Sequence, residues 1–186
     1  MHRRAFIASA SALAAGAVAA PAVAATAPYR LPPQFQARIV DVRPGWRAGD
    51  IHVDPGQRQL YLILPGDRAI RYGVAIGSAE QYVPGTFTVN RKAEWPSWTP
   101  TPNMIRREPE TYAKFAGGVP GGPDNPLGAR ALYLYKGGRD TMLRIHGTSQ
   151  PWSIGYSVSS GCVRMLNDHA IHLYDNVPIG TRVVLH

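Results

Sequence analysis

The sequence predicts one mostly β domain, built as a single antiparallel sheet or sandwich with one or two short helices. Its 186 residues suffice for one domain of ordinary size. The 19 glycines and 17 prolines disfavour a helical bundle, because both residues break helices. Hydrophobic residues make up 45% of the chain against 17% charged residues, which excludes a disordered chain.

Short runs of β-branched and aromatic residues, separated by turns, predict the strands. Pro-Gly pairs at positions 55–56 and 65–66 and a Gly-Gly pair at 137–138 are the clearest of these turns. This alternation is typical of an antiparallel meander. The predicted strands, in order, are residues 51–53, 59–64, 69–76, 85–89, 131–135, 142–146 and 181–185.

Residues 91–130 are rich in proline and predict an irregular loop with a short helix near residues 107–115. A loop of this length in a compact domain usually carries function, and a hydrophobic cover over the sheet is the alternative. We expect a second helix over residues 168–176, capped by Asn167 and burying one apolar face. The residues predicted on that face are Ala170, Ile171 and Tyr174.

Residues 1–24 combine a positively charged start, an apolar alanine-rich run and a small-residue end, which predicts a secretory signal peptide. The pair Arg3-Arg4 within it is similar to a twin-arginine signal, so we expect export to the periplasm. A membrane anchor is the alternative, but the run is weakly hydrophobic for a spanning helix. Residues 25–44 then predict a proline-rich linker, and residues 45–186 the folded domain.

Cys162 is the only cysteine in the chain, which excludes an intrachain disulfide and a cysteine-ligated zinc cluster. It could be a dimer link, a buried apolar residue or a reactive thiol. The small residues Ser159-Ser160-Gly161 before it leave the sulfur reachable. His146, 16 residues earlier at the end of a predicted strand, could take the thiol proton. An imidazolium beside the sulfur would hold the thiol pKa below its usual value of about 8.5.

The segment from His146 to Arg164 resembles the signature of the L,D-transpeptidase catalytic domain family, also called YkuD. In that signature a histidine and a spacer lead to Ser/Thr-x-Gly-Cys, then an apolar residue, then Asn or Arg. Many members have histidine where this chain has Ser160, a departure that leaves the nucleophile and the base in place. The resemblance extends from about residue 50 to the C-terminus through three further blocks, residues 123–132, 150–155 and 173–181.

The resemblance implies acyl transfer through a thioester on peptidoglycan stem peptides. Cys162 is then the nucleophile and His146 the base, with the Gly147 carbonyl orienting the imidazole ring. The backbone N–H groups of Gly161 and Cys162 would stabilise the oxyanion. Arg164 would hold a substrate carboxylate, and a structural ion pair is the alternative. The other expected substrate contacts are Ser159, Ser160, Trp152 and Tyr156.

The acceptor amine could belong to a neighbouring stem peptide, a free D-amino acid or an outer-membrane protein. Water in place of the amine would make the protein an L,D-carboxypeptidase, and a non-catalytic wall-binding β domain is the third alternative. The family further implies that carbapenems acylate Cys162. No cofactor is expected.

The remaining histidines and the net charge of +8 indicate no further site. His169 and His172 lie three apart on the predicted second helix, where we expect surface residues rather than metal ligands. His52 and His186 have no partner nearby in the sequence, so no role is assigned to them. The positive charge is scattered and no nucleic-acid-binding motif is present, so the expected partner is the anionic cell wall rather than nucleic acid.

Overall fold

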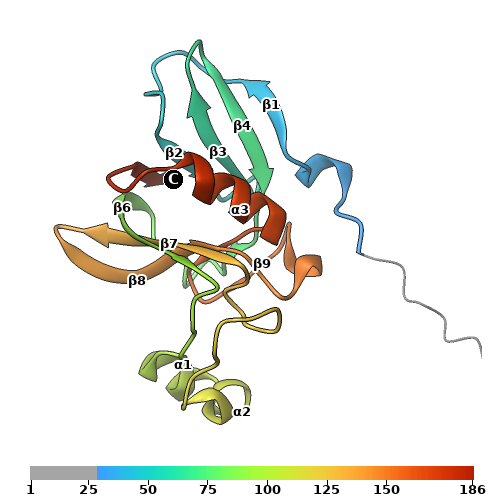
Figure 1. Cartoon of the computed structure of the whole chain (residues 1–186), viewed down its shortest axis with the longest axis vertical. Helices are drawn as coiled ribbons and strands as arrows, with labels where there is room; N and C mark the ends of the chain where they lie inside the picture. The colour runs from blue at the N-terminus through green and yellow to red at the C-terminus, as the bar shows by residue number, and fades with distance from the viewer. Residues whose placement is uncertain (1–28) are drawn as a thin grey trace, which may run out of the picture.

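The computed structural model describes residues 29–186 (Figure 1). The predicted signal peptide of residues 1–24 lies outside the described residues. Among the helices of residues 29–186, none combines the length and the apolar character that crossing a membrane requires.

The described residues form one nine-stranded sheet and one two-stranded sheet. The order in the large sheet is β1-β4-β3-β2-β11-β6-β7-β8-β10, and β5 pairs with β9. The strands are β1 (Arg38–Asp41), β2 (Ile51–Asp54), β3 (Gln59–Leu64), β4 (Arg68–Gly73), β5 (Ile76–Gly77), β6 (Gly85–Glu94), β7 (Arg130–Lys136), β8 (Arg139–His146), β9 (Ser157–Ser159), β10 (Val163–Arg164) and β11 (Arg182–Leu185).

The mostly β class and all seven predicted strands are confirmed, whereas a purely antiparallel sheet is wrong. β11 runs parallel to β2, β10 parallel to β8, and β5 parallel to β9. The sequence did not predict β1, β5, β9 or β10, which have four residues or fewer. The two or three residues of β5, β9 and β10 carry too little alternation to be recognised as strands, and β1 lies in the segment that the sequence analysis assigned to the linker.

The first part of the fold includes residues that the sequence analysis placed in the linker. A short 3₁₀ helix, η1 (Pro33–Phe35), precedes β1, which pairs antiparallel with β4 through Ile39 and Ile70. A Cβ atom on Gly73 would collide with the backbone of Phe35, so glycine is needed where η1 lies against β4. Residues 33–41, within the segment that the sequence analysis assigned to the linker, therefore pack against the sheet as η1 and β1.

Helix α3 (Asn167–Asn176) forms the centre of the core (Figure 1). The sheet curls around it, so α3 lies between the half with β2–β4 and the half with β6–β8. Ala170 and Leu173 of α3 are fully buried. Burial of a leucine side chain contributes about 2 kcal/mol to stability. The predicted helix is confirmed, but its most buried large side chain is Leu173, and Ile171 is only half-buried.

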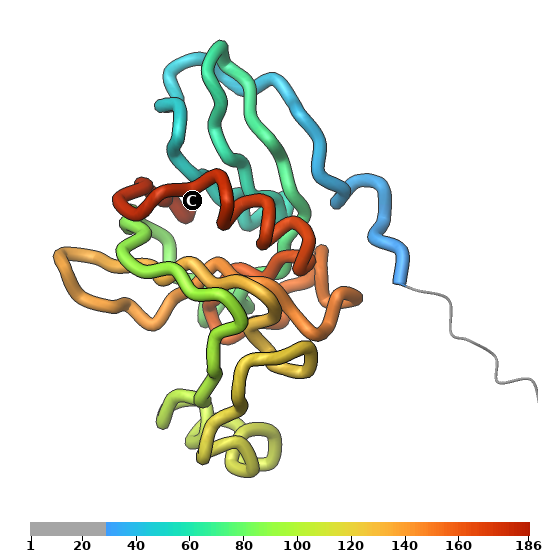
Figure 2. The backbone as a smooth tube through the Cα atoms, viewed as in Figure 1, coloured from blue at the N-terminus to red at the C-terminus, as the bar shows by residue number. Residues whose placement is uncertain are grey.

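Residues 95–129 form a flap that projects from the sheet (Figure 2). It contains α1 (Pro102–Arg107), α2 (Pro109–Tyr112) and the 3₁₀ turn η2 (Ala113–Phe115). Pro109 opens a new helix, because proline is favoured in a first turn and not in an interior. The single helix predicted near 107–115 is therefore two short segments, and Trp98 packs against them through edge contacts with Tyr112 and Phe115.

Candidate active site

Cys162 and His146 are brought together by the parallel pairing of β10 with β8. In this pairing Val163 lies beside Ile145, and Arg164 lies beside His146. Val163 and Ile145 point into the core, with exposed fractions of 1% and 0%. Because side chains alternate between the two faces of a strand, the residues on either side point to the outer face. His146, Arg164 and Cys162 therefore share the outer face, with Cys162 diagonal to His146.

The imidazole of His146 is held by the backbone. Its Nδ1 donates a hydrogen bond to the Gly147 carbonyl oxygen at 2.6 Å, and only 3% of the residue is exposed. Since the carbonyl can only accept, the proton is on Nδ1 and the lone pair is on Nε2. Burial lowers the pKa of His146 to about 3, and the charges of Arg164 and Arg144 act in the same direction. His146 is therefore neutral at neutral pH and can accept a proton at Nε2.

The thiol of Cys162 is half-buried, and its Sγ lies 3.8 Å from the carbonyl oxygen of Met142. Burial raises the pKa of the thiol above its usual value. The backbone N–H of Arg144 and the positive charges of Arg144 and Arg164 act in the opposite direction. Burial therefore favours the neutral form of both the thiol and the imidazole. The sequence-based expectation of a thiol pKa held below about 8.5 by an imidazolium is wrong for this structure, because burial disfavours both charged groups.

The turn before the thiol is fixed by Ser159 and Gly161. Gly161 has a φ of +112°, and a Cβ atom there would lie 2.8 Å from the carbonyl oxygen of Gln81. The Ser159 hydroxyl accepts from the Gly161 N–H at 3.3 Å and donates to the Cys162 carbonyl. Ser159 is only 3% exposed, so it shapes the turn. The Gly161 N–H therefore donates to Ser159, whereas the sequence analysis had assigned this N–H to stabilising the oxyanion.

Two arginines from different parts of the chain lie at this turn. Arg164 is half-buried, and its pKa is lowered by burial while nearby Cys162 and Tyr112 of α2 oppose the shift. Arg107 of α1 donates from Nη2 to the Ser160 hydroxyl at 3.0 Å. The flap therefore contacts the residues around the thiol. The sequence analysis had left open whether residues 91–130 carry function or only cover the sheet.

Arg144 is a buried charge beside the pair that the sequence analysis did not single out. Its guanidinium forms a two-pronged ion pair with Asp140, at 2.7 and 2.9 Å, and lies 4.2 Å from the centre of the Tyr133 ring. The interaction lowers the pKa of Asp140 despite partial burial. Since both prongs are used by Asp140, Arg144 contributes a fixed positive field rather than a free ligand group.

Asn167 is a second residue that the sequence analysis assigned differently. It was expected to cap α3, but Leu166 occupies the N-cap position and no side chain caps the helix. The Asn167 Oδ1 instead accepts from the N–H groups of Ala129 and Thr148, at 3.0 and 3.1 Å. Cβ atoms on Gly128 or Gly147 would collide with this oxygen. Asn167 thus joins α3 to the backbone that holds His146, a role visible only once distant segments are placed.

The remaining predicted residues are more dispersed. Trp152 and Tyr156 are 59% and 62% exposed on the segment that connects His146 to Cys162. That connection also contains the 3₁₀ turn η3 (Pro151–Ser153). His169 is half-buried against Tyr72, and His172 Nδ1 lies 2.8 Å from the Tyr72 hydroxyl. Both α3 histidines contact Tyr72 of β4, but His172 is exposed as expected, and only the half-buried His169 departs from the expectation of a surface residue.

A curled β sheet carries a cysteine and a backbone-held histidine near the ends of neighbouring strands. These are the groups that a thiol-dependent enzyme uses. Residues 48–185 match the model of the L,D-transpeptidase catalytic domain, YkuD. The match covers well over half of the chain, so the protein belongs to this family.

Individual relatives agree with the family assignment. The Escherichia coli protein named "Probable L,D-transpeptidase ErfK/SrfK" is 41% identical over 136 residues, 72% of this chain and 42% of that protein. The chain thus spans about two fifths of the length of that relative. A solved chain from Brucella melitensis, named "Probable carnitine operon oxidoreductase caia", is 47% identical with a TM-score of 0.57, over 84% of this chain and 96% of that one.

A more distant solved structure shares the fold. L,D-transpeptidase 3 from Mycobacterium tuberculosis, in complex with a faropenem-derived adduct, is 17% identical with a TM-score of 0.55. The likeness covers 75% of this chain and 60% of that chain.

Proposed function

We propose that this protein is an L,D-transpeptidase that transfers an acyl group from a peptidoglycan stem tetrapeptide to an amine through a thioester on Cys162. The observation that carries the proposal is the geometry of the base. His146 lies beside the strand that follows the thiol, with Nδ1 fixed by the Gly147 carbonyl. We assign the other ring nitrogen, Nε2, to the exchange of a proton with the sulfur.

The neutral pair starts the first half-reaction. The sulfur of Cys162 attacks the carbonyl carbon of the third stem residue as its proton moves to His146 Nε2. The carbonyl oxygen becomes an oxyanion, for which we assign the Cys162 N–H as donor. The tetrahedral intermediate collapses by breaking the C–N bond to the terminal D-Ala. The leaving amine takes the proton from His146, and a thioester remains on Cys162.

The second half-reaction reverses these proton movements. An acceptor amine attacks the thioester carbonyl, His146 Nε2 removes the proton of the amine, and the sulfur leaves with that proton. Because both groups are neutral at rest, each half-reaction begins and ends with the same charges. The charge that develops in between is stabilised by the nearby guanidinium of Arg164 and by Arg144.

Substrate binding is assigned to the surface between the flap and the Cys162 turn. Stem peptides carry carboxylates, and two guanidinium groups lie near the Cys162 turn, that of Arg107 on Ser160 and that of Arg164 near Cys162. Trp152 and Tyr156 add exposed aromatic surface on the connection between the base and the nucleophile. We assign these side chains to the donor or acceptor stem.

The cellular setting follows from the same proposal. The substrate lies in the cell envelope, so the arginine-containing leader predicted at residues 1–24 would direct the protein to the periplasm. We further propose that carbapenems acylate Cys162, because a β-lactam carbonyl offers the same reaction to the thiol. The faropenem adduct of the Mycobacterium tuberculosis relative supports this step.

The test is mass analysis of products after incubating purified protein with disaccharide tetrapeptide. We expect loss of D-Ala together with a cross-linked dimer, both abolished in Cys162→Ala and retained in Ser153→Ala, a buried serine of η3. Tripeptide without any dimer or exchange product, even with excess D-amino acid, would identify a carboxypeptidase instead. Absence of both products in wild-type protein that is fully folded would reject the enzymatic proposal.

A further inference from the structure

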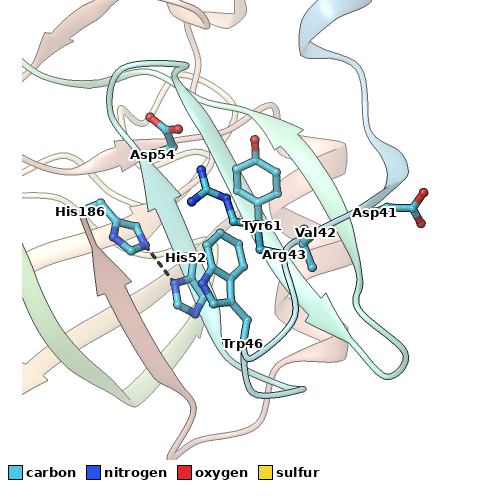
Figure 3. A pocket seen from close by; sticks show the side chains of 8 residues that line it. All are labelled: Asp41, Val42, Arg43, Trp46, His52, Asp54, Tyr61 and His186. Carbon is cyan, nitrogen blue, oxygen red and sulfur yellow. Dashed lines mark hydrogen bonds between the residues drawn. The ribbon is translucent and has the colours of Figure 1, made fainter.

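A cavity of about 600 Å³ lies on the large sheet, beside His52 of β2 and Tyr61 of β3 (Figure 3). Four strands, β11, β6, β7 and β8, separate β2 at this cavity from β10 at the thiol. The volume is within the usual range for small-molecule sites. The lining includes Arg43, Trp46, His52, Asp54, Tyr61 and His186.

The cavity wall is an ordered aromatic stack. The Trp46 ring lies on the His52 ring with centroids 4.2 Å apart and planes 2° apart, and Tyr61 meets Trp46 edge-on at 6.1 Å. His52 Nδ1 and His186 Nε2 are 3.0 Å apart and share a hydrogen bond. Residues 134 positions apart in the sequence thus form one rigid surface, which is pre-organised for a ligand.

Sheet geometry explains why these side chains meet. Ile51 and Val53 point into the core, so His52 between them points to the outer face. Tyr61 is the register partner of His52 on β3, and Leu185 pairs with Val53, which puts His186 at the same end of the outer face. The loop that carries Trp46 is held down by an ion pair at 2.7 Å between Asp50, which ends it, and Arg182.

The lining carries charges of both signs, and the Asp41 carboxylate points away from the other side chains (Figure 3). Asp41 and Asp54 contribute carboxylates and Arg43 a guanidinium, while burial and the nearby His186 lower the pKa of His52 and keep it neutral at neutral pH. An anion would meet the carboxylates, and a cation would meet the guanidinium. No three His, Cys, Asp or Glu side chains converge as metal ligands anywhere in residues 29–186. The lining therefore suits an uncharged ligand with both donor and acceptor groups.

We propose that this cavity binds an uncharged saccharide. A sugar ring presents an apolar C–H face, which can pack on the part of the half-buried Trp46 ring that lines the cavity. Its hydroxyl groups both donate and accept, which matches a rim that holds Asp54, Arg43 and the Tyr61 hydroxyl. In Figure 3 the side chains of Trp46, Arg43 and Tyr61 lie together along one side of the histidine pair. The site is independent of Cys162, and a glycan strand is the natural occupant if the protein acts on the cell wall.

The test is calorimetric titration of the purified protein with chitotetraose, an uncharged oligomer of β-linked N-acetylglucosamine, and with cellotetraose, which lacks the acetamido groups. We expect saturable binding of chitotetraose, and Trp46→Ala should lower the affinity roughly tenfold. Arg43→Ala should lower it a few-fold, and since Arg43 is exposed it leaves the fold intact. Binding of cellotetraose as well would widen the ligand to β-linked glucans.

Two controls separate this site from the proposed active site. Cys162→Ala should bind chitotetraose as the wild type does, so loss of transpeptidation alone leaves the saccharide proposal standing. Trp152→Ala, which removes an exposed tryptophan between His146 and Cys162, should also leave the affinity unchanged. Affinity lost in Trp152→Ala and kept in Trp46→Ala would place the sugar at the catalytic cysteine and overturn the proposal. Absence of binding in folded wild-type protein would overturn it too.

Discussion

The two histidine-bearing regions of this protein lie on the same outer face of one sheet, yet their chemistry differs. His146 is buried next to the backbone of Leu127, near the end of the flap, and burial lowers its pKa to about 3. His52 is covered mainly by Trp46 and pairs with a second histidine at the edge of an open cavity. The comparison shows that the covering segments, rather than the strands, decide whether a position on this face suits catalysis or ligand binding.

Removing the base should give the largest effect. His146→Ala should lower acylation by about a thousandfold, the range expected for loss of a positioned general base. Alkylation of Cys162 by iodoacetamide should change little, because that reaction follows the thiolate, and burial keeps the thiol protonated at neutral pH. Turnover of disaccharide tetrapeptide and alkylation rates measured on the same preparations check this.

The matched variant on the other region is His52→Ala, which should leave turnover of the soluble tetrapeptide within about twofold. Parallel losses of turnover and of alkylation in His146→Ala would instead mean that the histidine acts by holding a thiolate. The functional contrast between the two regions would then rest on charge rather than on proton transfer.

The second prediction concerns the link from α3 to the base. Asn167→Ala leaves the N–H groups of Ala129 and Thr148 without their acceptor and should destabilise the protein by about 2 kcal/mol. Because those groups flank Gly147, kcat should fall roughly tenfold with KM little changed. Urea unfolding and steady-state kinetics measure the two effects.

Asn167→Asp keeps an oxygen acceptor and should restore most of the turnover, while Asp168→Ala, an exposed neighbour on the same helix, should change neither quantity. If Asn167→Ala loses stability but keeps full kcat, the residue is structural only.

The pH dependence of stability should differ between the two histidines. A histidine with a lowered pKa stays neutral in the folded state while the unfolded chain takes up a proton below about pH 6.5. Stability should therefore fall as the pH drops from about 6.5 towards 3, by up to about 1.4 kcal/mol per pH unit for His146. Urea unfolding at several pH values should show a flatter profile for His146→Gln than for the wild type.

His52→Gln should flatten the same profile less, because His52 is shifted in the same direction but lines an open cavity. Equal flattening by both variants would show that the two histidines are equally buried in solution. It would contradict the difference in burial between the two regions.

The smallest effect is expected at the flap. Arg107→Ala removes the exposed hydrogen bond to Ser160 and should raise KM about threefold with little change in kcat, since exposed polar contacts contribute on the order of 1 kcal/mol or less. Arg106→Ala on the same helix serves as the control. A fall in kcat for Arg107→Ala would show that the flap takes part in the chemistry rather than only in binding.

Features that depend on neighbouring residues could be predicted from the sequence, whereas features that depend on contacts between distant segments could not. The alternation in residues 59–64 and 131–135 is local, so these strands could be predicted, as could the pairing of a base at 146 with a thiol at 162. The roles of Asn167 and of His52 with His186 could not, because each depends on contacts between segments far apart in the chain. The raised thiol pKa was missed for a related reason: burial depends on which segment covers the site, which no spacing within residues 146–164 reveals.

The parallel pairing of β10 with β8 also bears on how this protein can change over evolutionary time. Strand ladders set the positions of His146 and Arg164, and the turn of Ser159 and Gly161 sets that of Cys162, so the exposed side chains of Trp152 and Tyr156 in the intervening stretch are not needed to align them. Substitutions of these two side chains would alter the exposed aromatic surface, while the buried Ser153 and Ile154 keep the stretch in place. New acceptor preferences can therefore arise in that stretch by steps that each keep a working enzyme.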